Sequence, residues 1–198
     1  MKTKTHELSI SGEVLQRGFW LYIWEIQTPK SNHLYYVGRT GDSSSINAQS
    51  PFNRMGQHLS FNKGNMLRRH LEGKNINPET CSFRLITHGP ILKEAKTKDK
   101  HLKRRDSIAA MEKALADEMA TAGYNVINTV NCRMKLDVTK FASVRAAFAL
   151  HFKRLGRKKN KMKTKPLTFL LVLIFLISGS TTGSAKPRFG DYEGAIYV

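Results

Sequence analysis

Two tyrosines, an arginine and a histidine stand at spacings that allow them to share one site. Tyr22 and Tyr36 lie in two segments rich in aromatic and β-branched residues, which predict β-strands. The turn-forming residues 28–32 separate these segments, so the pattern predicts a β-hairpin with a longer loop. Arg54 and His58 are four residues apart, and a helix would place both side chains on one face. We therefore expect the hairpin and the next helix to bring two phenols, a guanidinium and an imidazole together.

The order of these residues resembles the motifs of the GIY-YIG nucleases, a family of metal-dependent phosphodiesterases. Trp20-Leu21-Tyr22 corresponds to the first motif and Tyr36-Val37-Gly38 to the second, and the family's Arg and His correspond to Arg54 and His58. The resemblance covers residues 18–128. It departs from the family in two places, because the first motif keeps only its Tyr and the loop 39–53 is longer than the compact pattern.

The family also has a Glu on a later helix and an Asn about a dozen residues beyond it. Glu112 and Asn125 fit these positions, and Asn128 is the alternative for the Asn. The resemblance implies that Asn125 contacts phosphate or fixes the helix that carries Glu112. A turn-capping Asn is the competing interpretation.

The resemblance implies a separate role for each of these side chains. Glu112 would be the single ligand of Mg²⁺, with Mn²⁺ as the alternative ion, because hard cations prefer carboxylate oxygen. Arg54 would hold the scissile phosphate, and Tyr22 and Tyr36 would orient or deprotonate the attacking water. His58 would hydrogen-bond a tyrosine hydroxyl or shuttle the proton. Taken one at a time, each residue also has an ordinary explanation as a packing or solvated side chain.

The charge of the chain predicts a polyanionic partner. The 198 residues contain 33 Lys and Arg against 15 Asp and Glu, a formal net charge of +18. Such an excess favours phosphate backbones, and we expect DNA rather than a membrane surface or a merely solvated face. The residues expected to contact DNA are Arg39, Lys63, Arg68, Arg69, Lys103, Arg104 and Arg105.

The pattern predicts an α/β (α+β) domain with a small three-stranded antiparallel sheet flanked by helices. The third strand is expected over 81–87. Helices are expected over 51–59, 65–71, 102–121 and 137–155, and the last is basic and amphipathic, with an apolar stripe at Phe141, Val144, Phe148, Phe152 and Leu155. The sequence leaves open whether this last helix packs on the core or contacts nucleic acid.

Composition divides the chain into four parts. Residues 1–17 are a flexible leader, 18–130 the nuclease-like domain, 131–161 a basic helical extension, and 162–198 an apolar tail. The two cysteines, Cys81 and Cys132, show no zinc or disulfide spacing, which indicates a reducing, cytoplasmic compartment.

The tail has the layout of a signal peptide inside the chain. A basic start at 162–165 precedes the apolar run Leu167 to Ile177 and the small residues 183–185. Three interpretations follow: a second reading frame fused at Met162, a marginal membrane anchor with weak membrane association, or a buried helix or hairpin. The fused frame is favoured because its tripartite order is complete.

The sequence as a whole predicts a metal-dependent endonuclease that hydrolyses DNA phosphodiester bonds. The alternatives are a non-catalytic nucleic-acid-binding module on the same scaffold and a membrane-tethered interaction protein.

Overall fold

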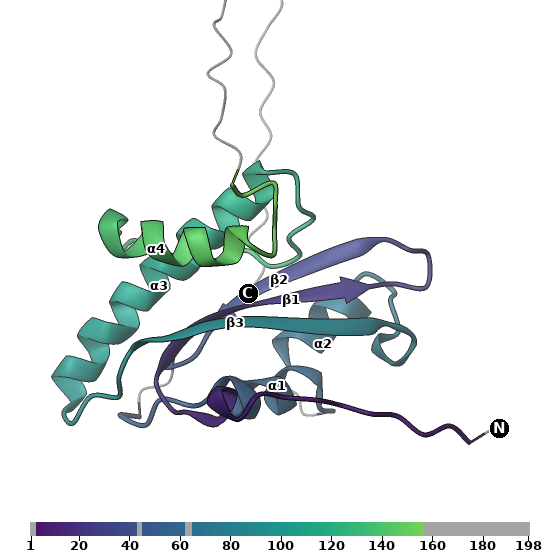
Figure 1. Ribbon diagram of the computed structural model, residues 1–198, viewed down its shortest axis with the longest axis horizontal. Helices are drawn as coiled ribbons and strands as arrows, with labels where there is room; N and C mark the ends of the chain where they lie inside the picture. Colours follow the sequence, from purple (N-terminus) through teal and green to yellow (C-terminus); the bar gives the residue numbers. More distant parts are fainter. Residues whose placement is uncertain (1–2, 43–44, 62–64, 157–198) are drawn as a thin grey trace, which may run out of the picture. The chain divides into compact units, whose positions relative to one another are not determined.

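A three-stranded antiparallel sheet forms the centre of the fold (Figure 1). The structure, a computed structural model, describes residues 3–42, 45–61 and 65–156. The central strand β1 (Phe19–Gln27) pairs with β2 (His33–Arg39) on one side and β3 (Ser82–Leu92) on the other. The coarse fold class and the hairpin predicted from the sequence are thereby confirmed.

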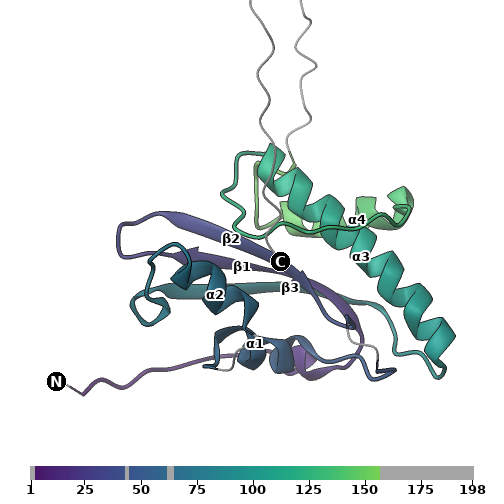
Figure 2. The ribbon, with the colours of Figure 1, turned by 180° about the vertical axis from the view of Figure 1, so that it is seen from behind.

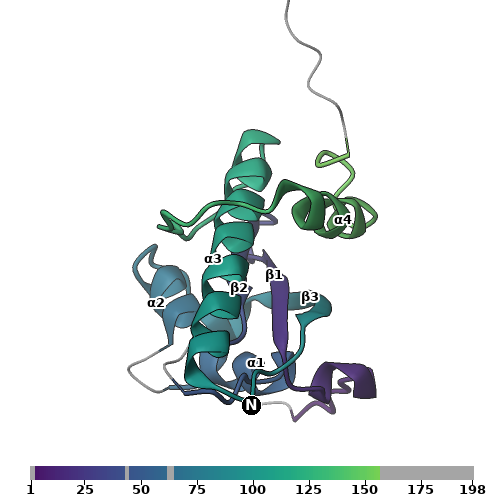
Figure 3. The same ribbon diagram turned by 90° about the vertical axis from the view of Figure 1, so that its left-hand side faces the viewer.

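Helices cover both faces of this sheet. The helices α3 (Lys98–Thr121) and α4 (Val138–Ala149) pack in one cluster with side chains of the sheet, and they lie toward the top and left of the strands in Figure 1. Seen from behind in Figure 2, α1 (Pro51–Leu59) and α2 (Met66–Glu72) lie in front of it, and the end view in Figure 3 places α2 and α4 on opposite sides. Because both faces are covered, β1 is an almost continuous apolar run rather than an alternating one.

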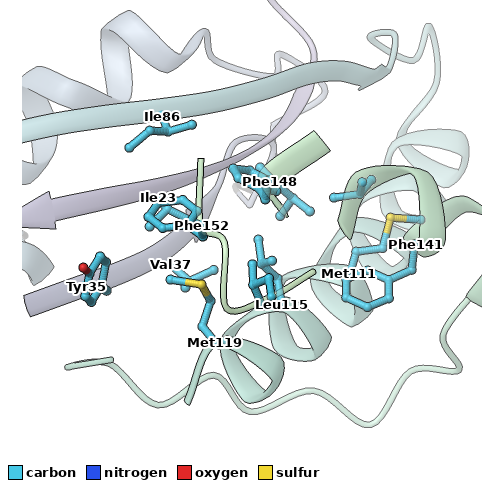
Figure 4. Close-up of a cluster of buried hydrophobic side chains, with 14 of the residues drawn as sticks. Ile23, Tyr35, Val37, Ile86, Met111, Leu115, Met119, Phe141, Phe148 and Phe152 are labelled. Atoms are coloured by element: carbon cyan, nitrogen blue, oxygen red, sulfur yellow. The ribbon is translucent and has the colours of Figure 1, made fainter. Parts of the chain in front are cut away.

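The larger core lies between the sheet and the helices α3 and α4 (Figure 4). Ile23, Val37 and Ile86 of the sheet pack in one cluster with Met111 and Leu115 of α3. The whole predicted apolar stripe of α4 and its following segment is buried in this cluster: Phe141, Val144, Phe148, Phe152 and Leu155. The question left open by the sequence is thus answered, because this face of α4 packs on the core.

Helix α4 is shorter than the range 137–155 predicted for it, since it ends at Ala149. The chain then turns, and Arg145 donates a hydrogen bond from Nη2 to the carbonyl oxygen of Leu155 (2.8 Å). This turn lets Phe152 and Leu155 reach the core without a continuous helix.

Other boundaries follow local capping chemistry. Ser50 caps α1 by accepting from the backbone N–H of Asn53 (3.2 Å), as its position before Pro51 predicts. Helix α3 begins at Lys98 rather than at 102, because Thr97 caps it there.

Within the described residues no helix is long and apolar enough to cross a membrane. Both Lys63 and the tail 162–198 lie outside the described residues.

Candidate functional site

Four of the predicted site residues meet on the α1 and α2 side of the sheet. Tyr22 of β1 and Tyr36 of β2 point to this face, because their strands pair so that Tyr22 lies opposite Gly38 and Tyr36 opposite Trp24. Helix α1 presents Arg54 and His58, one turn apart, to the two phenols. The hairpin and helix therefore assemble these side chains as the spacing predicted.

Gly38 makes room for the Tyr22 ring. A Cβ atom built on Gly38 would lie 2.4 to 2.6 Å from the ring and hydroxyl of Tyr22. Real Cβ atoms do not approach other atoms this closely, so any other residue at this position would displace the phenol. The glycine of the Tyr36-Val37-Gly38 motif thus sets the position of the tyrosine on the neighbouring strand.

Tyr22 and His58 form a buried hydrogen-bonded pair. The Tyr22 hydroxyl lies 2.5 Å from Nε2 of His58, and the two residues are 1% and 3% exposed. Burial, followed by the charge of Arg54, lowers the pKa of His58 to about 3, so the imidazole is neutral near pH 7. Burial raises the pKa of Tyr22 far above 10. With both groups neutral, the phenol donates to Nε2 in the His58 tautomer that carries its proton on Nδ1, and Nε2 donates to the phenol oxygen in the other tautomer.

Tyr36 contacts the same imidazole. Its ring meets His58 edge-on, with centroids 5.1 Å apart. Burial raises the pKa of Tyr36 to about 12, with the charge of Glu112 adding to the effect and Arg54 opposing it. Neither phenol is ionised at neutral pH in the free protein, so a pre-formed tyrosinate base is not part of this arrangement.

Arg54 is the cation of the cluster. Its Nη2 donates to Asp42 (3.1 Å) and its Nη1 to Gln57 (2.8 Å), while its buried Nε has no hydrogen-bond partner among the described residues. Its positive charge lowers the pKa of both Tyr22 and Tyr36 against the effect of burial. A guanidinium with an unused buried donor can donate a further hydrogen bond to a phosphate oxygen.

Asp42 is a site residue that the sequence reasoning missed. It pairs with Arg54, and its charge raises the pKa of both Tyr36 and Glu112. The only signal in the sequence is its place directly after Gly41. In the structure Gly41 has φ of +77°, and a Cβ atom added there would lie 2.4 Å from the ring of Phe19.

Glu112 of α3 stands beside this cluster and is paired. Its Oε2 accepts from Nε of Arg39 at 2.7 Å, and the two side chains are 13% and 19% exposed. Burial raises the pKa of Glu112 to about 7, Arg39 opposes the shift, and Asp42 adds to it. The carboxylate is thus held in a dry environment where a second positive charge would be favourable.

The donor set fits a hard divalent ion that keeps several of its waters. Such an ion needs one or two carboxylates, and Glu112 supplies one, with the charge of Asp42 nearby. The described residues contain no group of three or more His, Cys, Asp or Glu that could enclose a metal. Glu112 therefore fits Mg²⁺ as a single protein ligand, in competition with Arg39.

The two asparagines differ in position. Asn128 donates from Nδ2 to the carbonyl oxygen of Val37 (2.7 Å) and accepts at Oδ1 from the Val37 N–H (3.0 Å). Asn125 is exposed, and its backbone carbonyl accepts from the N–H of Tyr35 (2.9 Å). The side chain of Asn128, the alternative position, thus binds the strand that carries Tyr36.

The residues expected to contact DNA fall into two groups. Arg69 and Lys103 are exposed, whereas the others that the structure describes make internal contacts. Arg39 binds Glu112, and Arg68 is nearly buried between Glu72 and Glu79. Arg104 donates to the carbonyl oxygen of Lys93, and Arg105 pairs with Asp106.

The site can therefore hold an anion at Arg54, relay a proton between Tyr22 and His58, and hold a cation at Glu112.

No family model matches the chain, and neither does any curated protein or any solved structure.

Proposed function

We propose that this protein is a Mg²⁺-dependent endonuclease of the GIY-YIG type that hydrolyses phosphodiester bonds of DNA. The observation that carries the proposal is the hydrogen bond between Tyr22 and His58, with Arg54 close enough to both phenols to lower their pKa values. Phosphodiester hydrolysis needs these parts: a group that orients water, a proton acceptor and a cation for the phosphate oxygens.

In this proposal Arg54 binds the scissile phosphate through its unused Nε and by exchanging Asp42 for phosphate oxygens. The Tyr22 oxygen accepts a hydrogen bond from the attacking water, and its own proton passes to Nε2 of His58 as the water proton moves to Tyr22. The negative phosphate favours the imidazolium, because it opposes the burial and the Arg54 charge that lower the pKa of His58. Tyr36 packs edge-on against the imidazole and helps to hold its orientation.

A divalent ion bound at Glu112 would supply Lewis-acid stabilisation of the charge on the phosphate and leaving oxygen. The chain's part is to hold Glu112 in a dry position and to release it from Arg39. The freed Arg39 guanidinium would then face the same phosphate group.

The test is cleavage of supercoiled plasmid by the full chain, with and without Mg²⁺, beside Glu112→Gln. The matched control is Glu118→Gln, which removes a carboxylate from the same helix, where it pairs with Arg145. We expect Mg²⁺-dependent nicking or linearisation by the parent and by Glu118→Gln, and none by Glu112→Gln. Equal cleavage by all three proteins would remove Glu112 from the site.

The second candidate is a non-catalytic DNA-binding module. The observation that favours it is the Arg39 to Glu112 ion pair, which occupies the proposed metal ligand. This candidate predicts DNA binding without cutting across several divalent metals and DNA forms. The membrane-tethered alternative rests on residues 167–177, outside the described residues.

A further inference from the structure

A cavity of about 390 Å³ lies where the turn of the β1–β2 hairpin meets the segment 74–80 that follows α2. Figure 2 shows this turn and this segment side by side at one end of the sheet. Leu34 lines the cavity, and Tyr36 stands two residues further along the same face of β2. Since a strand rises about 3.3 Å per residue, the cavity begins roughly 7 Å from the Tyr36 position.

The lining carries positive charge. Lys30 and Lys74 line the cavity, both are exposed, and neither forms an ion pair within the part of the chain that the structure describes. No carboxylate belongs to its lining. Glu72 and Glu79 of the neighbouring segment both pair with Arg68, at 3.1 and 2.8 Å, so these three residues carry a net charge of −1 against the +2 of the two lysines. The cavity therefore favours an anion.

The lining also holds unused hydrogen-bonding groups. Thr28 is 8% exposed, and its buried hydroxyl has no hydrogen-bond partner among residues 3–42, 45–61 and 65–156. The side-chain amides of Asn32 and Asn75 line the same cavity and make no hydrogen bond within the described ranges. A buried hydroxyl left unpaired costs about 1–3 kcal/mol, and a ligand oxygen recovers this only if binding exposes the Thr28 hydroxyl to the cavity. Cationic and neutral donors around one small cavity match the oxygens of a phosphate group.

We infer that this cavity is a second phosphate subsite, which binds a phosphodiester group of the DNA strand whose scissile phosphate lies at Arg54. The inference rests on the proposed function and extends it to substrate positioning. Because the cavity begins roughly 7 Å from Tyr36 along β2, the phosphate that it binds would lie within a few nucleotides of the scissile one. The subsite would fix the direction of the strand across the sheet.

The first experiment is a salt titration of DNA binding by the full chain, in EDTA, on a short duplex. Lys30→Ala/Lys74→Ala is compared with Lys135→Ala/Lys153→Ala, a control that removes two exposed lysines beside α4. Each phosphate contact contributes about 0.9 to the slope of log K against log salt, so the first pair lowers the slope by about 2. Between about 50 and 150 mM salt the parent then loses roughly sevenfold more affinity than the variant. Equal slopes in the two double variants would overturn the subsite.

The second experiment tests the hydroxyl and the source of the phosphate. Thr28→Val keeps the side-chain shape and removes the oxygen, so we expect weaker duplex binding with an unchanged fold. Amide shifts of Thr28, Lys30 and Lys74 are followed by NMR with the duplex, with inorganic phosphate and with a deoxynucleoside monophosphate. Shifts with the duplex support the inference. Shifts with the free phosphates alone, or with none of the three, overturn it.

The two proposals fail separately. If the parent cuts plasmid and Lys30→Ala/Lys74→Ala binds DNA like its control, the subsite is refuted and the nuclease stands. If the parent binds the duplex with the predicted slope change but never cuts, the subsite stands and the catalytic proposal is refuted.

Discussion

The hydroxyl of Tyr22 and Nε2 of His58 lie 2.5 Å apart in the interior, although 36 residues separate them in the chain. Replacing Tyr22 by Phe removes the hydroxyl and keeps the ring. We expect cleavage to fall by about two to four orders of magnitude, the typical contribution of a positioned proton-transfer group. We also expect a loss of about 1–3 kcal/mol in the free energy of unfolding, because the buried imidazole loses its partner.

Tyr35→Phe is the matched control for this change. It removes a hydroxyl on the opposite face of β2, where the oxygen contacts Glu25 at 3.3 Å. Cleavage by this variant should match the parent, measured beside thermal unfolding of both. Full cleavage by Tyr22→Phe would contradict the proposed proton relay.

Stability should depend on pH through His58. Its pKa is about 3 in the folded protein and 6.5 in the unfolded chain, so the unfolded state binds the proton more tightly. The contribution of His58 is fully present above pH 6.5 and is lost as the pH falls toward 3. Relative to His58→Gln, the parent should lose about 1–2 kcal/mol between pH 6.5 and pH 5. Urea unfolding at both pH values measures this difference, and parallel curves would contradict it.

Gly38→Ala should disturb the site from the neighbouring strand. Its Cβ would meet the Tyr22 ring at 2.4 Å, and overpacking of this kind costs about 1–3 kcal/mol. Gly56→Ala is the control, since a Cβ there has no atom within 4 Å and the residue lies inside α1. This second change should raise the free energy of unfolding by about 0.5–1 kcal/mol. Chemical denaturation and plasmid cleavage of both variants provide the comparison.

Arg39→Gln should make stability more sensitive to high pH. The pKa of Glu112 is raised to about 7 in the fold, so its stabilising contribution is present below pH 4.5 and is lost as the pH rises through 7. Without Arg39, whose charge opposes this rise in pKa, the ionised Glu112 carboxylate destabilises the folded state more. We expect an extra loss on the order of 2 kcal/mol at pH 8 relative to pH 5. Adding Glu112→Gln to the variant should abolish this pH-dependent part in urea titrations.

Asn128→Ala and Asn125→Ala separate the two asparagines. The first removes both hydrogen bonds to Val37 and should cost about 1–3 kcal/mol. The second removes an exposed side chain and should leave the unfolding free energy within about 0.5 kcal/mol of the parent. Equal losses in thermal unfolding would show that the Asn128 contacts carry no stability.

Local patterns explain why much of this fold could be predicted. The hairpin and the Ser50 cap of α1 depend on residues close in the chain, and both were predicted at their observed positions. The spacing of Arg54 and His58 works in the same way, because four residues make about one helical turn.

Contacts between distant segments could not be predicted in this way. The Arg39 to Glu112 pair joins residues 73 positions apart, and Asn128 binds a strand 91 positions earlier. No periodicity records such a pair. Asp42 was missed for the same reason, and Arg68 carries no mark in the sequence that separates its inward position from the exposed Arg69.

The strand in the middle of the sheet, β1, is also the first strand of the chain. During synthesis the centre of the sheet therefore leaves the ribosome before either strand that flanks it, and α3, which carries Glu112, follows β3. Tyr22 is made 90 residues before Glu112. A nascent or truncated chain that stops short of α3 lacks the Glu112 carboxylate, so under the proposed function it would not cleave nucleic acid before α3 has been made.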